Sequence, residues 1–258
     1  MGALRLMLVW LGLVLSGAAI AGTVSLSTED GKTLSATSYG SGTKGVLLVH
    51  GKGGSAADWE NFAGKLAQNG FRVLAIDLRG HGRSKSAADP LDEADWLAMV
   101  ADVDAGAAWL KRQGAEVSVV GARLGANLAL NAAQDNADIT GVVLLSPGLN
   151  IEGLKVLSAA ATYTGPVLVV ASKGDTTSAK AATFLESKAG GPATLQLVDA
   201  DGAGHKLINT EASLEASLVG WLNGARGEGG DLAKPDRTLE TGTVDGIETT
   251  GTRYEDSL

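Results

Sequence analysis

The chain has 258 residues, of which 45% are hydrophobic and 19% charged, values that suit one globular domain with a substantial core. Its formal net charge of -8, without any run of Lys or Arg, argues against nucleic acid and anionic lipid surfaces as partners. The sequence has no cysteine and only three histidines, which excludes disulfides and thiolate metal sites and leads us to expect no metal and no cofactor.

Residues 1–21 have the pattern of an export signal. Arg5 is a short positive segment, Leu6 to Leu15 is apolar, and Ala19-Ile20-Ala21 is a small-x-small cleavage pattern. An uncleaved anchor is the alternative, but the apolar stretch up to Ala21 is 16 residues long, shorter than the ~20 of a spanning helix. We therefore expect cleavage after Ala21, a periplasmic or extracellular location, and no stable membrane insertion afterwards.

Strands and helices alternate through residues 22–223. Two alternating stretches around Asp30-Gly31 predict an N-terminal β-hairpin. Short apolar runs predict buried strands at 46–49, 73–76, 117–120, 142–145, 167–170 and 195–198, and helical spacing predicts helices at 58–68, 91–113, 124–134 and 210–222. Repeated strand–helix–strand units predict a mostly parallel central sheet with helices on both faces.

Residues 224–258 differ from the rest of the chain. They are rich in Gly, Thr, Asp and Glu, with four basic and eight acidic residues, so their net charge is -4. This composition predicts a disordered, solvated acidic tail, with a weak hairpin around Asp245-Gly246 as an alternative.

Four loops that follow predicted strands contain the residue types of an active site. In α/β sheets, ligands bind at the carboxyl ends of strands, where such loops meet. In chain order the loops are His50-Gly51-Lys52-Gly53-Gly54, then Asp77 to Ser84, then Gly121-Ala122-Arg123-Leu124-Gly125, and last the pair Asp175 and His205.

These loops, in this order, resemble those of the α/β-hydrolase family. There a G-x-S-x-G turn joins a strand to a helix, and the acid and the histidine follow later in the chain. The resemblance covers about Val46 to Leu222 and implies a single-domain hydrolase fold with Asp175 and His205 as catalytic acid and base. The stretch from Pro147 to Gly165 leaves room for one short helix, such as 153–161, so no large lid is expected and the implied relatives are small esterases or dienelactone-hydrolase-like enzymes.

The departure from the family pattern is Arg123, which stands where the resemblance implies a nucleophile. A guanidinium has no lone pair available for attack and stays protonated, so Arg123 cannot act as one. Backbone N–H groups of Lys52 and Leu124 match the family's oxyanion donors; an ordinary glycine turn is the alternative for the Lys52 loop. Gly121 and Gly125 keep the small residues that a tight turn needs.

Other polar and aromatic residues have structural interpretations. Arg79 and His81 are expected to fix the loop that contains them, and Asp58 is expected to cap a helix. Trp59 and Trp221 are expected in the core.

Three functions remain open at this point. The first is a hydrolase-derived protein that binds a small anion at Arg123 and the neighbouring donors instead of hydrolysing esters covalently. The second is an active carboxylic-ester hydrolase in which His205 and Asp175 activate water, or in which another nucleophile such as Ser55 replaces the missing one. The third is an ordinary esterase in which Arg123 is a variant. The expected partner is in every case a small-molecule ligand or ester substrate.

Overall fold

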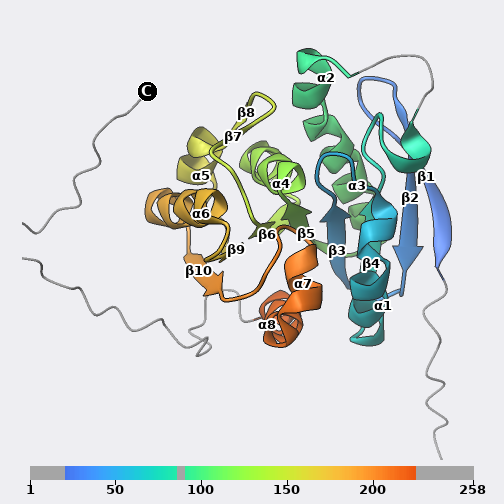
Figure 1. Ribbon diagram of the computed structural model, residues 1–258. Helices are drawn as coiled ribbons and strands as arrows, with labels where there is room; N and C mark the ends of the chain where they lie inside the picture. The colour runs from blue at the N-terminus through green and yellow to red at the C-terminus, as the bar shows by residue number, and fades with distance from the viewer. Residues whose placement is uncertain (1–20, 86–90, 225–258) are drawn as a thin grey trace, which may run out of the picture. The chain divides into compact units, whose positions relative to one another are not determined.

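A central eight-stranded sheet organises the computed structural model, which describes residues 21–85 and 91–224. The strand order is β1-β2-β4-β3-β5-β6-β9-β10 (Figure 1). The strands are β1 (Gly22–Ser27), β2 (Thr33–Tyr39), β3 (Lys44–Val49), β4 (Phe71–Ile76), β5 (Glu116–Ala122), β6 (Ile139–Leu145), β9 (Val167–Ser172) and β10 (Ala193–Val198). Of the predicted signal peptide (1–21), residues 1–20 lie outside the described residues, and so do residues 225–258 of the predicted tail (224–258).

The predicted hairpin and parallel sheet are confirmed. β1 and β2 pair antiparallel from Gly22↔Ser38 to Ser27↔Thr33, and β2 is antiparallel to β4. All later neighbours in the sheet are parallel. β3, β5 and β6 are almost completely buried, as expected for strands covered by helices on both faces.

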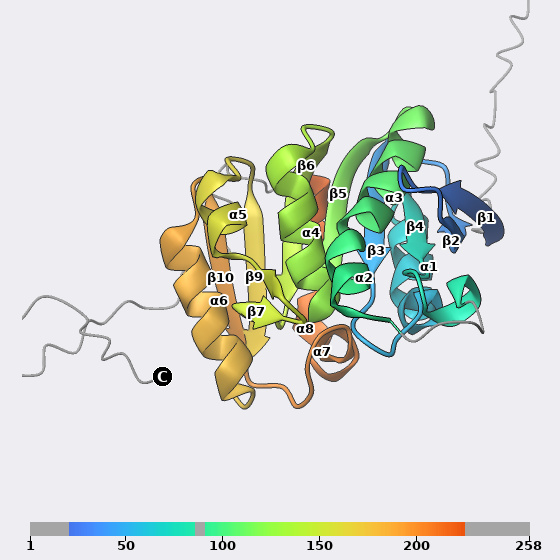
Figure 2. The ribbon, with the colours of Figure 1, turned by 90° about the horizontal axis from the view of Figure 1, so that it is seen from above.

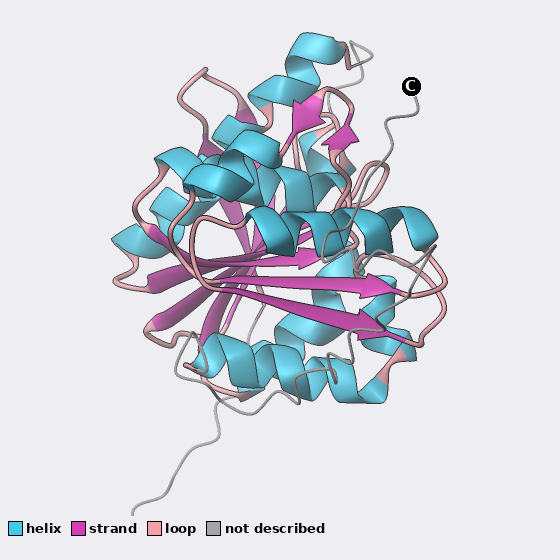
Figure 3. Cartoon of the chain, turned by 90° about the vertical axis from the view of Figure 1, so that its left-hand side faces the viewer, coloured by secondary structure: helices cyan, strands magenta, loops and turns pink. Residues whose placement is uncertain are grey.

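Helices cover both faces of the sheet (Figure 3). They are α1 (Glu60–Gln68), α2 (Glu93–Ala98), α3 (Val100–Arg112), α4 (Leu124–Asp135), α5 (Leu157–Thr162), α6 (Thr176–Lys188), α7 (Lys206–Thr210) and α8 (Ala212–Asn223), with short 3-10 helices η1 (Ala56–Trp59) and η2 (Gly82–Ser84). α3, α4, α5 and α6 contact one another in that order along one face (Figure 2). α1 and α8 lie on the other face, where Lys65 and Glu215 join them through an ion pair of 2.5 Å.

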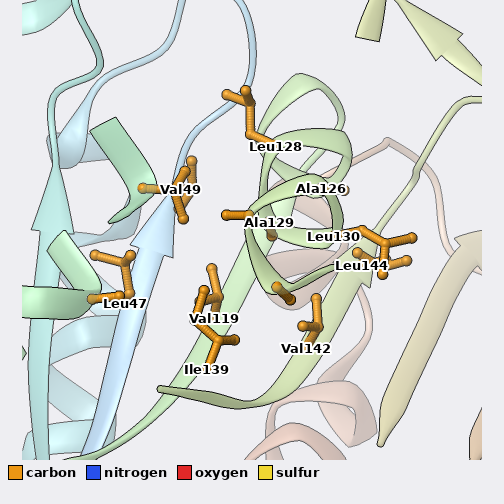
Figure 4. Close-up of a cluster of buried hydrophobic side chains, with 14 of the residues drawn as sticks. Leu47, Val49, Val119, Ala126, Leu128, Ala129, Leu130, Ile139, Val142 and Leu144 are labelled. Carbon is orange, nitrogen blue, oxygen red and sulfur yellow. The ribbon is translucent and has the colours of Figure 1, made fainter. Parts of the chain in front are cut away.

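The core lies between the sheet and the layer that contains α4. Side chains from β3, β5 and β6 meet those of α4 there (Figure 4), and the labelled members are Leu47, Val49, Val119, Ala126, Leu128, Ala129, Leu130, Ile139, Val142 and Leu144. The alanines of α4 and its one glycine, Gly125, let this helix lie close to the strands. α4 therefore begins at a fixed place beside the end of β5, where the site is located.

Several elements differ from the sequence prediction. The helix expected at 91–113 is two helices separated at Met99, which is fully buried; no Gly or Pro marks this break. α6 was not predicted because its buried residues are few and mostly small, and α7 was not predicted because it has only five residues. The segment between β6 and β9 contains a small hairpin, β7 (Asn150–Ile151) and β8 (Leu154–Lys155), before its one short helix, so the absence of a large lid is confirmed for these described residues.

Candidate functional site

Arg123 occupies the expected tight turn between β5 and α4. Its backbone has φ 53° and ψ -111°, an unfavourable conformation for a residue with a Cβ. The turn closes because two glycines leave room: a Cβ on Gly121 would overlap the Gly125 carbonyl, and one on Gly125 would lie 2.6 Å from the His50 carbonyl oxygen. The Arg123 N–H donates to Leu145 O over 2.9 Å, which ties the turn to β6. The sequence thus builds a strained strand-to-helix turn and presents an arginine at its tip.

The Arg123 side chain extends from this turn into the solvent-accessible site. It is 54% exposed, and its Nη1 lies 3.4 Å from Asp175 Oδ2. On its other side it packs against Gly204, where an added Cβ would lie 3.3 Å from Arg123 Cγ. The Arg123 side chain therefore lies between the Asp175 loop and the His205 loop.

Asp175 follows β9 and caps α6. Its Oδ1 accepts a hydrogen bond of 3.1 Å from the Ser178 N–H, while Oδ2 faces Arg123. Both carboxylate oxygens are thus directed to groups other than a histidine. Among the described residues no hydrogen bond or ion pair joins Asp175 to His205, so their pairing stays a prediction of the family resemblance.

His205 follows β10 and begins α7. Its ring packs at 5.8 Å from the fully buried Trp59 ring, with an interplanar angle of 59°. Burial lowers the pKa of His205; the negative charge of Asp58 opposes this effect, and the positive charge of Lys206 adds to it. The imidazole is therefore largely neutral at pH 7 and can accept a proton.

Lys52 lies in a four-residue turn in which Gly54 N–H donates to Gly51 O over 3.0 Å and Gly53 has φ 75°. Its side chain points away from Arg123: Nζ pairs with Glu152 Oε1 of the β7–β8 hairpin at 2.7 Å and lies 5.0 Å from the Trp96 ring centroid. Only the backbone of Lys52 is thus free for an oxyanion role.

Leu124 is the first residue of α4, and its side chain is fully buried. Its N–H belongs to the first turn of a helix, where backbone donors lack intrahelical acceptors. Whether this N–H and that of Lys52 act together as oxyanion donors remains a prediction of the resemblance.

An open cavity of about 560 Å³ brings most of these groups together. Its walls are largely backbone, because glycines and alanines from three loops form them. The lining residues are Gly51, Lys52, Gly53, Gly54, Asp58, Ala122, Arg123, Gly202, Ala203, Gly204, His205 and Lys206. Asp58 was assigned only a capping role from the sequence; it does belong to the capping box of η1, but it also lines this cavity.

A second strained turn carries a serine that the sequence pattern did not indicate. Ser146 follows β6, has φ 52° and is 1% exposed. Its Oγ accepts a 2.9 Å hydrogen bond from the Gly204 N–H, so Ser146 helps to fix the loop that contains His205. Neither Ser146 nor Ser55 lines the cavity among the described residues, so neither hydroxyl is placed to attack a ligand there.

Arg79 and His81 hold their loop in place, as expected, and His50 also has a structural role. Arg79 pairs with Asp102 and Asp30, each at 2.6 Å, and thereby ties its loop to α3 and to the N-terminal hairpin. His50 is fully buried; the Leu78 N–H donates to its Nε2 over 3.1 Å, and burial lowers its pKa to about 4. His81 packs between the rings of His50 and Trp96.

The described residues contain neither a metal-ligand cluster nor a membrane-spanning helix. No cluster of three or more His, Asp or Glu in this part of the chain is arranged to hold a metal ion. None of the helices within 21–85 and 91–224 combines the length and apolar character needed to span a bilayer.

Comparison with known proteins agrees with the fold. A family model described as serine aminopeptidase, S33, matches residues 41–160. The thermostable monoacylglycerol lipase of Bacillus sp. (strain H-257) is 33% identical over 113 residues, 44% of this chain and 44% of the lipase. Lipase LipV of Mycobacterium tuberculosis is 36% identical over 121 residues, 46% of this chain and 43% of that protein. These matches cover less than half of either relative.

Solved structures match over a larger share of the chain. Dienelactone hydrolase from Anabaena variabilis superposes with a TM-score of 0.69 and 19% identity, covering 80% of this chain and 98% of that one. The esterase Pf2001 of Pyrococcus furiosus gives 0.65 and 19%, with 80% and 92% covered. The chain is an α/β-hydrolase-fold protein, and less than half of it is similar in sequence to the two bacterial lipases.

Proposed function

We propose that this chain is an exported protein derived from a serine ester hydrolase, and that its cavity binds a small organic anion, a carboxylate or a phosphate ester, in place of covalent ester hydrolysis. The observation that carries the proposal is Arg123 itself. It stands at a strained turn of the kind that presents a nucleophile in the resembling family, and its guanidinium cannot attack.

The charges around the cavity favour an anion. Two cationic side chains, those of Arg123 and Lys206, belong to the lining residues, against one carboxylate, Asp58. Lys52 also lines the cavity, but its ammonium group is neutralised by Glu152. The Arg123–Asp175 pair is long, at 3.4 Å, and exposed on the arginine side. Exposed pairs of this kind contribute about 0–1 kcal/mol, so a ligand carboxylate or phosphate can displace Asp175 at little cost.

The shape and charge of the expected ligand follow from the Arg123 guanidinium and from the backbone at the start of α4. A planar guanidinium binds carboxylate or phosphate through two parallel N–H···O bonds. The start of α4 adds the positive end of a helix dipole beside it. A cavity of about 560 Å³ is larger than an inorganic ion needs, so the anionic group would belong to an organic molecule.

Isothermal titration calorimetry with acetate, inorganic phosphate and phenyl phosphate tests this proposal. Arg123→Gln should weaken binding by about 10- to 100-fold, because charge-assisted hydrogen bonds contribute about 1.5–3 kcal/mol. Lys173→Gln is the matched control, because Lys173 is 55% exposed and pairs with Asp199 but does not line the cavity. If no anion binds, or if Arg123→Gln binds as well as the wild type, the proposal is wrong.

A second candidate function is ester hydrolysis by water that His205 activates. The lowered pKa of His205 favours it, because a neutral imidazole can take the proton from water. Hydrolysis of p-nitrophenyl acetate by the wild type that disappears in His205→Ala would support this function over simple binding.

Export is a separate part of the proposal and rests on the signal pattern of residues 1–21. N-terminal sequencing of protein recovered from the periplasm or medium of an expressing bacterium should begin at Gly22. Full-length protein retained in the cell would contradict it.

A further inference from the structure

Asp58 is directed toward the cavity by its own loop. Its Oδ2 accepts a 3.1 Å hydrogen bond from the Ser55 N–H, which folds the side chain back along η1. The carboxylate then lies so close to Gly54 that a Cβ on this glycine would overlap Oδ2. The missing side chain at position 54 thus allows the carboxylate to lie at the cavity wall.

Asp58 and His205 are held in relation to each other by Trp59. Trp59 is adjacent to Asp58 in the chain, is fully buried, and packs its ring at 5.8 Å from the His205 ring. Both Asp58 and His205 line the same cavity. The relative position of the carboxylate and the imidazole is therefore set by a rigid aromatic contact, although they come from opposite ends of the domain sequence.

Asp175 has partners on both of its carboxylate oxygens, whereas among the described residues Asp58 has a hydrogen bond on Oδ2 alone. The two oxygens of Asp175 face the Ser178 N–H and Arg123, at 3.1 Å and 3.4 Å. We propose that Asp58, and not Asp175, is the carboxylate that positions and electrostatically supports His205, and that Asp175 instead serves Arg123. Asp58 is a positioning residue in this arrangement, since it acts through His205.

The proposal predicts how His205 responds to charge. Two charged groups act on its ring, Asp58 from η1 and Lys206 from α7, and the cationic residues Arg123 and Lys52 line the same cavity. Of these, Asp58 is the one negative side chain, so its charge stabilises the imidazolium. Neutralising Asp58 should therefore lower the pKa of His205.

NMR titration of the imidazole protons measures this directly in the full chain, with His205→Gln used to assign the signal. Asp58→Asn should lower the midpoint of His205 by on the order of half a pH unit, the size expected for charges near each other with access to solvent. Asp175→Asn should leave it nearly unchanged. Asp95→Asn is the matched control, because Asp95 occupies the same capping-box position in α2, where its Oδ2 accepts from the Asp92 N–H. A larger decrease in Asp175→Asn than in Asp58→Asn would overturn the proposal.

A kinetic test applies to Arg123→Ser and rests on the proposed hydrolase ancestry. Adding Asp58→Asn to this variant should reduce kcat/KM for p-nitrophenyl acetate at least tenfold, and adding Asp175→Asn should reduce it by less. The reverse order would contradict the proposal. If Arg123→Ser is inactive, the ancestry proposal is weakened, while the NMR result still decides the role of Asp58.

Discussion

Replacing Arg123 with serine should create measurable esterase activity, because the structure retains most of what a serine nucleophile would need. The turn at position 123 already has the strained backbone, with φ 53° and ψ -111°, and Gly121 and Gly125 keep it closed. A neutral His205 lines the same cavity, so a base is available. Removing the arginine side chain also frees the space that its Cγ and Cδ occupy against Gly204.

The size of the gain depends on how His205 is oriented. A complete triad contributes about 10⁶-fold to kcat, and loss of correct orientation by the acid costs about 10⁴-fold. Asp175 makes no hydrogen bond to His205 within the described residues, so a variant without an effective acid should gain about 10²-fold. Effective support from Asp58 would increase the gain beyond this.

The assay is p-nitrophenyl acetate turnover by the purified wild type, Arg123→Ala, Arg123→Ser, and Arg123→Ser combined with His205→Ala. Arg123→Ala controls for the loss of bulk without adding an attacking oxygen. Only Arg123→Ser should gain activity, and His205→Ala should remove the gain. A folded Arg123→Ser protein that is no faster than Arg123→Ala would refute the argument that the site around position 123 is preserved.

Two further predictions concern stability. Gly125→Ala should lower the free energy of unfolding by about 2–3 kcal/mol, because the new Cβ would strike the backbone of β3. Gly64→Ala, in α1 with open space around it, should raise the free energy of unfolding by about 0.5–1 kcal/mol. Urea unfolding measures both values, and equal effects of the two substitutions would contradict the close packing of α4. The buried His50, whose pKa falls from 6.5 to about 4, stabilises the fold fully above pH 6.5 and loses this contribution as the pH falls toward 4, by about 3 kcal/mol in all. His50→Asn should flatten the dependence over this range, and an unchanged slope would show that another group is responsible.

Much of the fold could be predicted from the sequence because the strands are continuous apolar runs. β3, β4, β5, β6 and β9 all lie where such runs predicted them, and Asp30-Gly31 marked the hairpin. α6 was not predicted because three of its four buried residues, Ser178, Ala181 and Ala182, are small, so their helical spacing does not stand out as an apolar stripe. The β7–β8 hairpin is too short to produce an alternating pattern.

The site was predicted less completely than the fold. The glycine spacing around Arg123 was sufficient to predict the strained turn, because only small residues permit it. The partners of the charged groups could not be predicted, since they depend on which way each side chain turns. Asp58 is the main example: its sequence position indicated a cap, while its exposure to the cavity depends on Gly54 and on the contact between Trp59 and His205. The strained Ser146 lacked any motif that could have revealed it.

The central claim is that the wild-type cavity has no competent nucleophile, and intact-mass measurement after treatment with a fluorophosphonate tests it most directly. Such reagents phosphonylate a serine that a neighbouring base activates. We predict no adduct on the wild type and one phosphonyl group on Arg123→Ser, located at position 123 by peptide mapping. Stoichiometric labelling of a wild-type serine, such as Ser55 or Ser146, that is lost in His205→Ala would contradict the claim and show that this protein hydrolyses esters through another nucleophile.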